Sequence, residues 1–276
     1  MRCCLTRLWI TTALCVSVHV ATAARAAEPR TEDVTFTAKC DKTAQHYVVV
    51  YPDGFKPGEP HHLLIALHGH GSDRWQFVRG AFDEARAVRD VAAAHRMLFV
   101  SPDYRKCTSW MGPKAEADLL QIIDDLRARY RIGKVIVCGG SMGGSSCLTF
   151  AAMHPDRTDG VASMNGTANH LEYDKFQDAI AESFGGTKAQ IPREYKKRSA
   201  EYWPERLTMP VGIAVGGKDD VVPPASVIRL AGILKKLQPN VLLIVREAGG
   251  HTTSYADGKE ILEFVLRKAG IKEPGK

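Results

Sequence analysis

One segment constrains this chain more than any other: the apolar run Val135–Cys138 leads directly into Gly139–Gly143, which reads Gly-Gly-Ser-Met-Gly. The β-branched run indicates a buried strand, and Ser145–Met153 after it indicates a helix. A tight strand-to-helix turn leaves no room for side chains at its ends, which explains the two outer glycines. The turn would hold the Ser141 hydroxyl at a helix N-terminus, where partial positive charge stabilises developing negative charge. A Gly/Ser turn without function is the alternative, and the strand–turn–helix context favours a nucleophilic serine.

Strand and helix patterns alternate from about residue 34 onward, as in an α/β fold with a mostly parallel sheet covered by helices on both faces. The first two strands are expected to form an antiparallel lead-in, and Gly133 is expected to end the helix before the serine strand. The predicted strands are 34–38, 46–51, 62–67, 98–102, 134–138, 160–164, 211–215 and 241–246, and the predicted helices are 84–95, 114–131, 145–154, 225–237 and 256–268.

The first 26 residues read as a signal peptide. Arg2 and Arg7 begin a basic stretch, Leu8–Val20 is largely apolar, and Ala24–Ala26 offers a cleavage site, with Ala21–Ala23 as a second candidate. The apolar stretch is short for a membrane span, although an uncleaved anchor is the alternative. We therefore expect a secreted or periplasmic protein without stable membrane association, in which residues 27–276 form a single catalytic domain.

Charge and cysteine content limit the classes of partner and the kinds of metal or disulfide site that this chain could have. Cleavage would remove three arginines and no acid, so the formal charge would fall from +6 to +3, too little to suggest nucleic-acid binding. Four cysteines would remain, an even number that permits disulfides in an oxidising compartment and does not have zinc-site spacing. Cys138 is expected to be a buried apolar residue. We expect Cys107 to pair with Cys147, although a pair that includes Cys40 or four free thiols would also fit the sequence.

A serine nucleophile requires a base and an acid that orients it. The predicted strand 211–215 ends in a loop containing the adjacent Asp219 and Asp220, and the strand 241–246 is followed by a loop with His251. Residues just past strand ends face the same cleft, and the register Gly-x-x-Asp-x-x-Val-Pro favours Asp219 over Asp220. Among the other histidines, His170 is the remaining competitor to His251.

Two backbone N–H groups are expected to bind the oxyanion. One belongs to Met142, the residue after the serine. The other is assigned to His70, because the predicted strand 62–67 runs into the glycine-rich segment His68–Gly71. An ordinary turn at this position is the alternative.

Residues 165–209 break the strand–helix rhythm. This segment, which we call the excursion, carries charges and aromatic residues, and it is expected either to pass over the carboxyl edge of the sheet near the cleft or to be surface without a binding role. Aromatic residues that could form an acyl pocket or a carbohydrate platform, or could be core and surface residues, are Trp75, Tyr104, Trp110 and Trp203.

Together these motifs resemble those of exported α/β-hydrolases. The segment Cys107–Trp110 and the lead-in Tyr130–Val135 are similar to those of the group containing feruloyl esterases, acetylxylan esterases and polyhydroxybutyrate-depolymerase-like proteins. Met142 and Ser199–Pro210 look equally like prolyl-oligopeptidase-type catalytic domains and dienelactone-hydrolase-like proteins.

The resemblance implies a serine hydrolase that cleaves carboxylic esters through an acyl-enzyme. Ser141 would attack, His251 would act as base and acid, and Asp219 would orient the imidazole, with no metal or organic cofactor. The substrate would be a small-molecule or carbohydrate ester. Because the excursion is charged and has no contiguous apolar stripe, we expect short or aromatic acyl esters of polar alcohols to be preferred over long-chain triglycerides, although a broad esterase is an alternative. The sequence is also compatible with a prolyl-oligopeptidase-type serine peptidase and with a non-catalytic binding protein of this fold.

Overall fold

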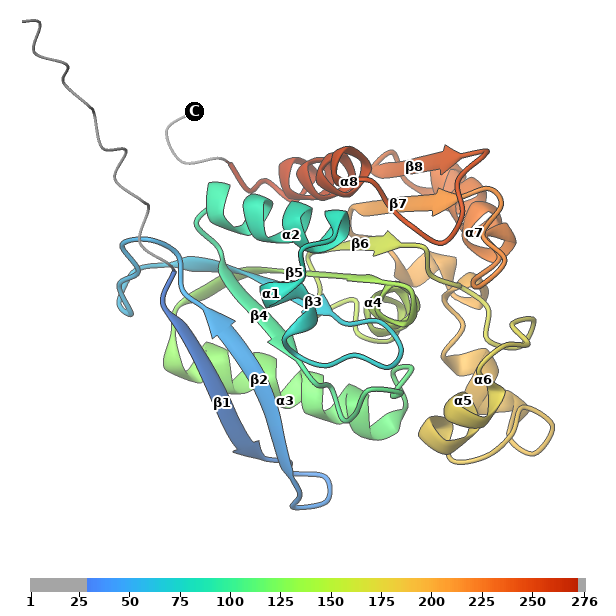
Figure 1. The fold of residues 1–276 in the computed structure, drawn as a ribbon, viewed down its shortest axis with the longest axis horizontal. Coiled ribbons are helices and arrows are strands. Elements are labelled where there is room, and N and C mark those ends of the chain that lie inside the picture. The colour runs from blue at the N-terminus through green and yellow to red at the C-terminus, as the bar shows by residue number, and fades with distance from the viewer. Residues whose placement is uncertain (1–28, 273–276) are drawn as a thin grey trace, which may run out of the picture.

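The computed structural model describes residues 29–272, which form an eight-stranded sheet with helices on both faces (Figure 1). The predicted signal peptide lies outside the described residues. The strands lie in the order β1-β2-β4-β3-β5-β6-β7-β8. Their bounds are β1 Thr31–Thr37, β2 Ala44–Val50, β3 His61–Leu67, β4 Leu98–Pro102, β5 Ile132–Gly140, β6 Gly160–Met164, β7 Val211–Gly216 and β8 Val241–Arg246.

The sheet is parallel except at one edge. β1 pairs antiparallel with β2, and β2 pairs antiparallel with β4, whereas all the pairs from β4 through β8 are parallel. The α/β fold class and the antiparallel lead-in predicted from the sequence are therefore confirmed. Parallel strands place all their carboxyl ends at one edge, so the loops after β3, β5, β7 and β8 meet there.

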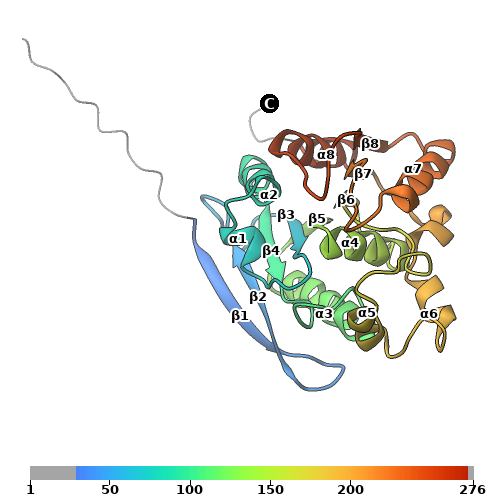
Figure 2. The same ribbon diagram turned by 45° about the vertical axis from the view of Figure 1, so that its right-hand side comes forward.

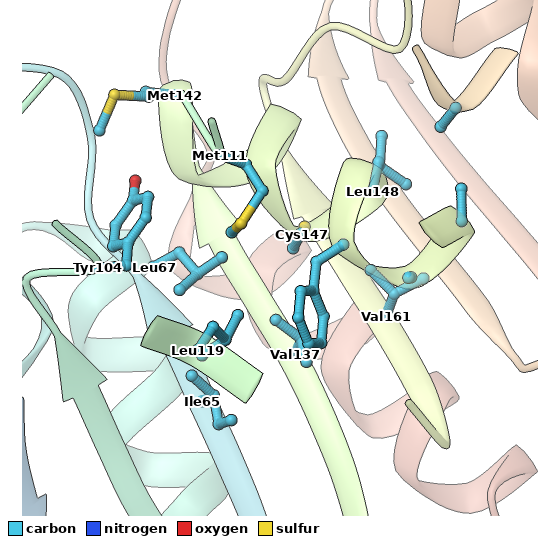
Figure 3. Packing of buried hydrophobic residues seen from close by; sticks show 14 of the residues in the cluster. Ile65, Leu67, Tyr104, Met111, Leu119, Val137, Met142, Cys147, Leu148 and Val161 are labelled. Carbon is cyan, nitrogen blue, oxygen red and sulfur yellow. The ribbon is translucent and has the colours of Figure 1, made fainter. Parts of the chain in front are cut away.

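Each face of the sheet carries its own apolar core. Along β3, Leu63, Ile65 and Leu67 pack on one face, while Leu64 and Ala66 pack on the other. This period of two explains why the strand is apolar throughout, because both of its faces are covered. Figure 3 shows part of the first core, where side chains of β3 and β5 meet those of the helices that cover this face.

Two sets of helices cover the two faces of the sheet (Figure 2). Residues of α2 (Asp83–Ala94) and α8 (Tyr255–Lys268) belong to one core. Residues of α3 (Pro113–Arg129), α4 (Met142–Met153) and α7 (Ala225–Leu237) belong to the other. The short helix α1 (Gln76–Arg79) precedes α2. No helix in residues 29–272 is long and apolar enough to cross a membrane.

The excursion between β6 and β7 has no strand within the described chain, as predicted. It contains α5 (Gln177–Phe184), α6 (Pro192–Lys197) and two short 3₁₀ helices, Ala200–Tyr202 and Pro204–Arg206. The buried guanidinium of Arg198 attaches it to the body of the domain. Arg198 donates to the carbonyl of Met111 at 2.6 Å and to Glu116 at 2.8 Å.

Three expectations about local structure were wrong. The helix α3 ends at Arg129, because Tyr130 is extended, and Gly133 lies inside β5 instead of capping the helix. The helix after the serine starts at Met142, three residues earlier than predicted. The expected Cys107–Cys147 disulfide is absent: Cys107 is exposed, whereas the buried Cys147 donates from Sγ to a backbone carbonyl within α4.

Candidate active site

Ser141 lies in a strained turn between β5 and α4. Its φ of 57° and ψ of −119° are values that residues with side chains rarely adopt. Any Cβ added at Gly143 would lie 1.9 Å from the carbonyl oxygen of Leu67 in β3, and one at Gly139 would lie 2.5 Å from Gly143. The backbone of the turn therefore packs against the neighbouring strand, as the two outer glycines indicated. The N–H of Ser141 donates to the carbonyl of Met164 at 2.8 Å.

The structure brings Ser141, His251 and Asp219 into one hydrogen-bonded chain. His251 Nε2 lies 2.8 Å from Ser141 Oγ, and His251 Nδ1 lies 2.7 Å from Asp219 Oδ2. A carboxylate can only accept, so Nδ1 carries the proton and donates it to Asp219. The Nε2 atom is then the acceptor for the serine hydroxyl, which is the arrangement that a general base requires.

The acid of this chain is Asp219 and not its neighbour Asp220. The side chain of Asp219 is buried, and its Oδ1 accepts from the N–H groups of Val221 and Val222 at 2.9 Å each. These two bonds fix the carboxylate so that Oδ2 faces His251. Asp220 is exposed, and its carbonyl oxygen accepts from Lys175.

The loops that carry the acid and the histidine pack closely at the ends of β7 and β8. A Cβ at Gly216 would lie 2.1 Å from the carbonyl oxygen of Gly250, and the N–H of Lys218 donates to the carbonyl of Gly249 at 2.8 Å. The absence of a side chain at Gly216, at the end of β7, thus allows the histidine loop to approach this closely.

Asn165, at the end of β6, was missed by the sequence analysis. Its amide donates to Thr253 Oγ1 at 2.9 Å, and its Oδ1 accepts from the N–H of Gly216 at 3.2 Å. It therefore connects the histidine loop to the end of β7. Its φ is 49°, a conformation that asparagine tolerates better than most residues. An asparagine directly after a strand was the only signal available.

The two amides predicted for the oxyanion belong to the serine turn and to the loop after β3. Met142 is the first residue of α4, so its N–H has no partner within the helix. The N–H of His70 donates no hydrogen bond within residues 29–272. Gly69, just before it, donates to Gln76 Oε1 at 2.7 Å, and Gly71, just after it, donates to the carbonyl of Cys107 at 2.8 Å. These bonds pin the loop on both sides of His70, and the role of Gln76 was not predicted.

The first histidine of this loop is structural. Both ring nitrogens of the buried His68 lie near carbonyl oxygens, Nδ1 at 2.8 Å from Gly69 O and Nε2 at 3.2 Å from Asp103 O. Burial lowers the pKa of His68, although the two carbonyls oppose this effect. The hydroxyl of Tyr104 donates to the carbonyl of His68 at 2.6 Å and so helps to hold the loop.

The four candidate substrate-binding aromatic residues are not brought together as one platform. Tyr104 and Trp110 are buried, so neither presents a face to solvent, and Figure 3 shows Tyr104 in the apolar cluster with Met142. Assigning these two as substrate contacts was therefore wrong. Trp75 and Trp203 are half-buried and lie under the guanidinium groups of Arg79 and Arg206, respectively.

The excursion contacts the candidate site. The ring of Phe176 lies 4.4 Å, between centroids, from that of His70 in the oxyanion loop. Tyr173 donates from its hydroxyl to the carbonyl of Val221 in the acid loop at 3.0 Å. Residues 173–176 thus lie between the two loops, which favours the expectation of an excursion near the cleft. His170 is fully buried with its Nε2 3.5 Å from Thr149 Oγ1, whereas His251 contacts Ser141, so the geometry favours His251 as the base.

Fold and geometry together define a serine hydrolase with the α/β-hydrolase fold. The chain belongs to the prolyl oligopeptidase family, whose model matches residues 104–271, more than half of the chain. It is also similar to feruloyl esterase C of Emericella nidulans, with 30% identity over 88 residues. That match covers 30% of this chain and 32% of the esterase, so the chain spans about a third of this curated relative.

Solved structures share the fold. FphF, a fluorophosphonate-binding serine hydrolase of Staphylococcus aureus, has a TM-score of 0.67 and 16% identity, with 86% of this chain and 98% of that chain covered. S-formylglutathione hydrolase of Agrobacterium tumefaciens has a TM-score of 0.67 and 15% identity, with coverages of 90% and 97%. The putative dipeptidyl aminopeptidase IV of Bacteroides ovatus has a TM-score of 0.70 and 17% identity, but only 36% of that chain is covered, against 88% of this one.

Proposed function

We propose that this protein hydrolyses carboxylic esters through an acyl-enzyme formed on Ser141. The observation that carries the proposal is the continuous chain from Asp219 through His251 to Ser141, with hydrogen bonds of 2.7 and 2.8 Å. A serine hydroxyl at its ordinary pKa is a weak nucleophile, and a base already within hydrogen-bond distance can take its proton as attack proceeds.

In the first half-reaction, Ser141 Oγ attacks the ester carbonyl while His251 Nε2 accepts the serine proton. The resulting imidazolium is stabilised by the carboxylate of Asp219, whose other oxygen stays bound to two backbone N–H groups. His251 then donates the proton to the leaving alcohol oxygen as the C–O bond breaks. In the second half-reaction a water molecule repeats these steps on the acyl-enzyme and releases the acid.

The N–H groups of Met142 and His70 would stabilise the oxyanion of both tetrahedral intermediates. Neither side chain is needed for this role, since the donors belong to the backbone. Losing one oxyanion donor in a serine hydrolase lowers kcat by about 10²–10³. The Met142 amide also lies at the positive end of the α4 dipole, which adds to the stabilisation.

An ester substrate is supported by the names of two relatives, feruloyl esterase C and S-formylglutathione hydrolase. The latter is matched over 97% of its length, whereas the dipeptidyl aminopeptidase is matched over 36%. The family match supports peptide hydrolysis as the second candidate, because the family takes its name from an oligopeptidase. The same triad can cleave either bond. We further propose that the protein is exported, because its first 26 residues are basic and then apolar, as in a signal peptide.

A panel of four substrates tests the proposed reaction: p-nitrophenyl acetate, methyl ferulate, a long-chain p-nitrophenyl ester and a prolyl amide. We expect the highest kcat/KM on the acetate or the ferulate, because the charged excursion has no contiguous apolar stripe for a long chain. Highest efficiency on the prolyl amide would establish the peptidase instead. The Ser141→Ala variant, assayed at the same concentration, controls for background hydrolysis.

A further inference from the structure

The imidazole of His70 has a defined protonation state. The indole Nε1–H of Trp110 donates to His70 Nδ1 at 3.1 Å. Because an indole nitrogen can only donate, Nδ1 must be the unprotonated acceptor, and a neutral ring then carries its hydrogen on Nε2. Burial lowers the pKa of His70, which favours this neutral form.

The orientation of the ring is fixed as well. Phe176 of the excursion lies against it at 4.4 Å between ring centroids, and Trp110 lies at 6.0 Å. Trp110 is completely buried, whereas Phe176 is 38% exposed. The imidazole is thus held between a core residue and a surface residue, with Nδ1 facing the core.

The opposite nitrogen, Nε2, has no partner among the described residues. Within residues 29–272, Nε2 of His70 makes no hydrogen bond, and it is not one of the buried polar atoms that lack a partner. It therefore points to solvent. The preceding residue, Gly69, lies beside the carbonyl of Gly140, next to the serine. Trp110, which binds His70, also donates from its backbone N–H to Met142 Sδ, so His70 lies beside the serine turn.

The backbone and the side chain of His70 serve different substrate atoms. The backbone N–H is directed at the oxyanion under the proposed function, and Nε2–H lies at the far end of the side chain. The two donors are separated by the whole residue, so they reach different acceptors.

The order of the strands indicates which part of the ester Nε2–H reaches. His251 follows β8 and must contact the leaving-group oxygen, whereas His70 follows β3, on the other side of β5 and Ser141. Under the proposed function, with the oxyanion held by the backbone N–H groups of Met142 and His70, we expect the alcohol toward β8 and the acyl group on the side away from His251, toward the loop after β3.

We propose that His70 determines acyl specificity: its Nε2–H donates a hydrogen bond to an acceptor atom near the scissile carbonyl in the acyl group, and Trp110 is the positioning residue that fixes the donating tautomer. This inference rests on the proposed ester hydrolysis. The favoured substrates are esters of acids with an ether, hydroxyl or carbonyl oxygen close to the carboxyl carbon.

Two p-nitrophenyl esters of nearly equal size test this proposal. Methoxyacetate and butyrate differ by an ether oxygen in place of a methylene, and the ratio of their kcat/KM values in wild type sets the reference. In His70→Phe this ratio should fall by about three- to tenfold, the usual effect of one neutral hydrogen bond. His70→Gln, which retains an N–H donor, should keep more of it. A ratio unchanged in His70→Phe overturns the proposal.

A spectroscopic measurement tests the tautomer without depending on activity. In ¹H–¹⁵N long-range correlation spectra of the wild-type protein at pH 7, assigned with His70→Phe, Nδ1 of His70 should be unprotonated and Nε2 protonated. Trp110→Phe, which keeps the ring and removes the donor, should allow both tautomers. A protonated Nδ1 in wild type overturns the inference. A protein with the expected spectrum that hydrolyses neither ester contradicts the proposed function instead.

Discussion

The side chain of Asn165 donates a hydrogen bond of 2.9 Å to Thr253 Oγ1, and both residues are buried. This bond connects the end of β6 to the loop that carries His251, two residues before Thr253. The N–H of Thr253 also donates to Glu84 at 2.7 Å, so the loop is held from α2 as well. The position of the base therefore depends on residues that never touch the serine.

Replacing Thr253 by valine should damage both stability and activity. Valine has the same shape but no hydroxyl, so the buried amide of Asn165 would lose its acceptor, at a cost of about 1–3 kcal/mol. We expect a lower urea midpoint and a reduced kcat, with a small effect on KM. Thr253→Ser keeps the hydroxyl and serves as the control. Equal stability and kcat in the valine variant and wild type would refute a positioning role.

Asp219→Asn should lower kcat far more than Asp220→Asn. An amide at position 219 cannot stabilise the imidazolium and can reverse the direction of the hydrogen bond to His251, and comparable changes in serine proteases cost about 10⁴ in kcat. Asp220 is exposed and does not contact the histidine, so its variant should resemble wild type. Steady-state kinetics on one ester decides between them, and a greater loss in Asp220→Asn would show that the acid is wrongly assigned.

A methyl group at Gly143 should prevent correct folding of the serine turn. The added Cβ would lie 1.9 Å from the backbone of Leu67, and backbone cannot move aside as a flexible side chain can. The matched control is Gly232→Ala in α7, where the added Cβ meets nothing within 4 Å and should stabilise the helix by about 0.5–1 kcal/mol. Thermal unfolding of both variants measures this contrast. A Gly143→Ala protein as stable as wild type would contradict the close packing of the first turn of α4 against the end of β3.

Asp118 gives a prediction about pH. Burial raises the pKa of this carboxyl from 3.8 to about 6, despite its ion pair with Arg105. Because the folded state binds the proton more tightly than the unfolded state, the stability that this group contributes is present below pH 3.8 and is lost as pH rises toward 6. The difference in unfolding free energy between wild type and Asp118→Asn should fall by up to about 3 kcal/mol across this window. Urea titrations at several pH values test it, and parallel curves for the two proteins would count against a raised pKa.

The strands and the order of the site residues were predictable because both depend on local patterns. The apolar run at Leu63–Leu67 predicts a strand covered on both faces, and glycines beside Ser141 predict a turn. The helices α1, α5 and α6 were not predicted because they are short and their apolar residues show no long periodicity.

Contacts between segments far apart in the chain could not be predicted from the sequence. The bond from Trp110 to His70 and that from Asn165 to Thr253 each join residues 40 or more positions apart, and no spacing rule links them. The prediction of a Cys107–Cys147 disulfide was wrong for the same reason, since an even number of cysteines does not fix the distance between any two of them. Tyr104 and Trp110 show that an aromatic residue near a predicted cleft can equally be core.

The most direct test of the account is intact-protein mass spectrometry after treatment with a fluorophosphonate, combined with an ester assay of the same samples. Wild type should gain one phosphonyl adduct, located by peptide mapping at Ser141, and should lose its esterase activity in proportion. The Ser141→Ala variant should fold as wild type does, remain unlabelled and hydrolyse no ester above background. Labelling at another residue, or an alanine variant that retains wild-type activity, would contradict Ser141 as the nucleophile.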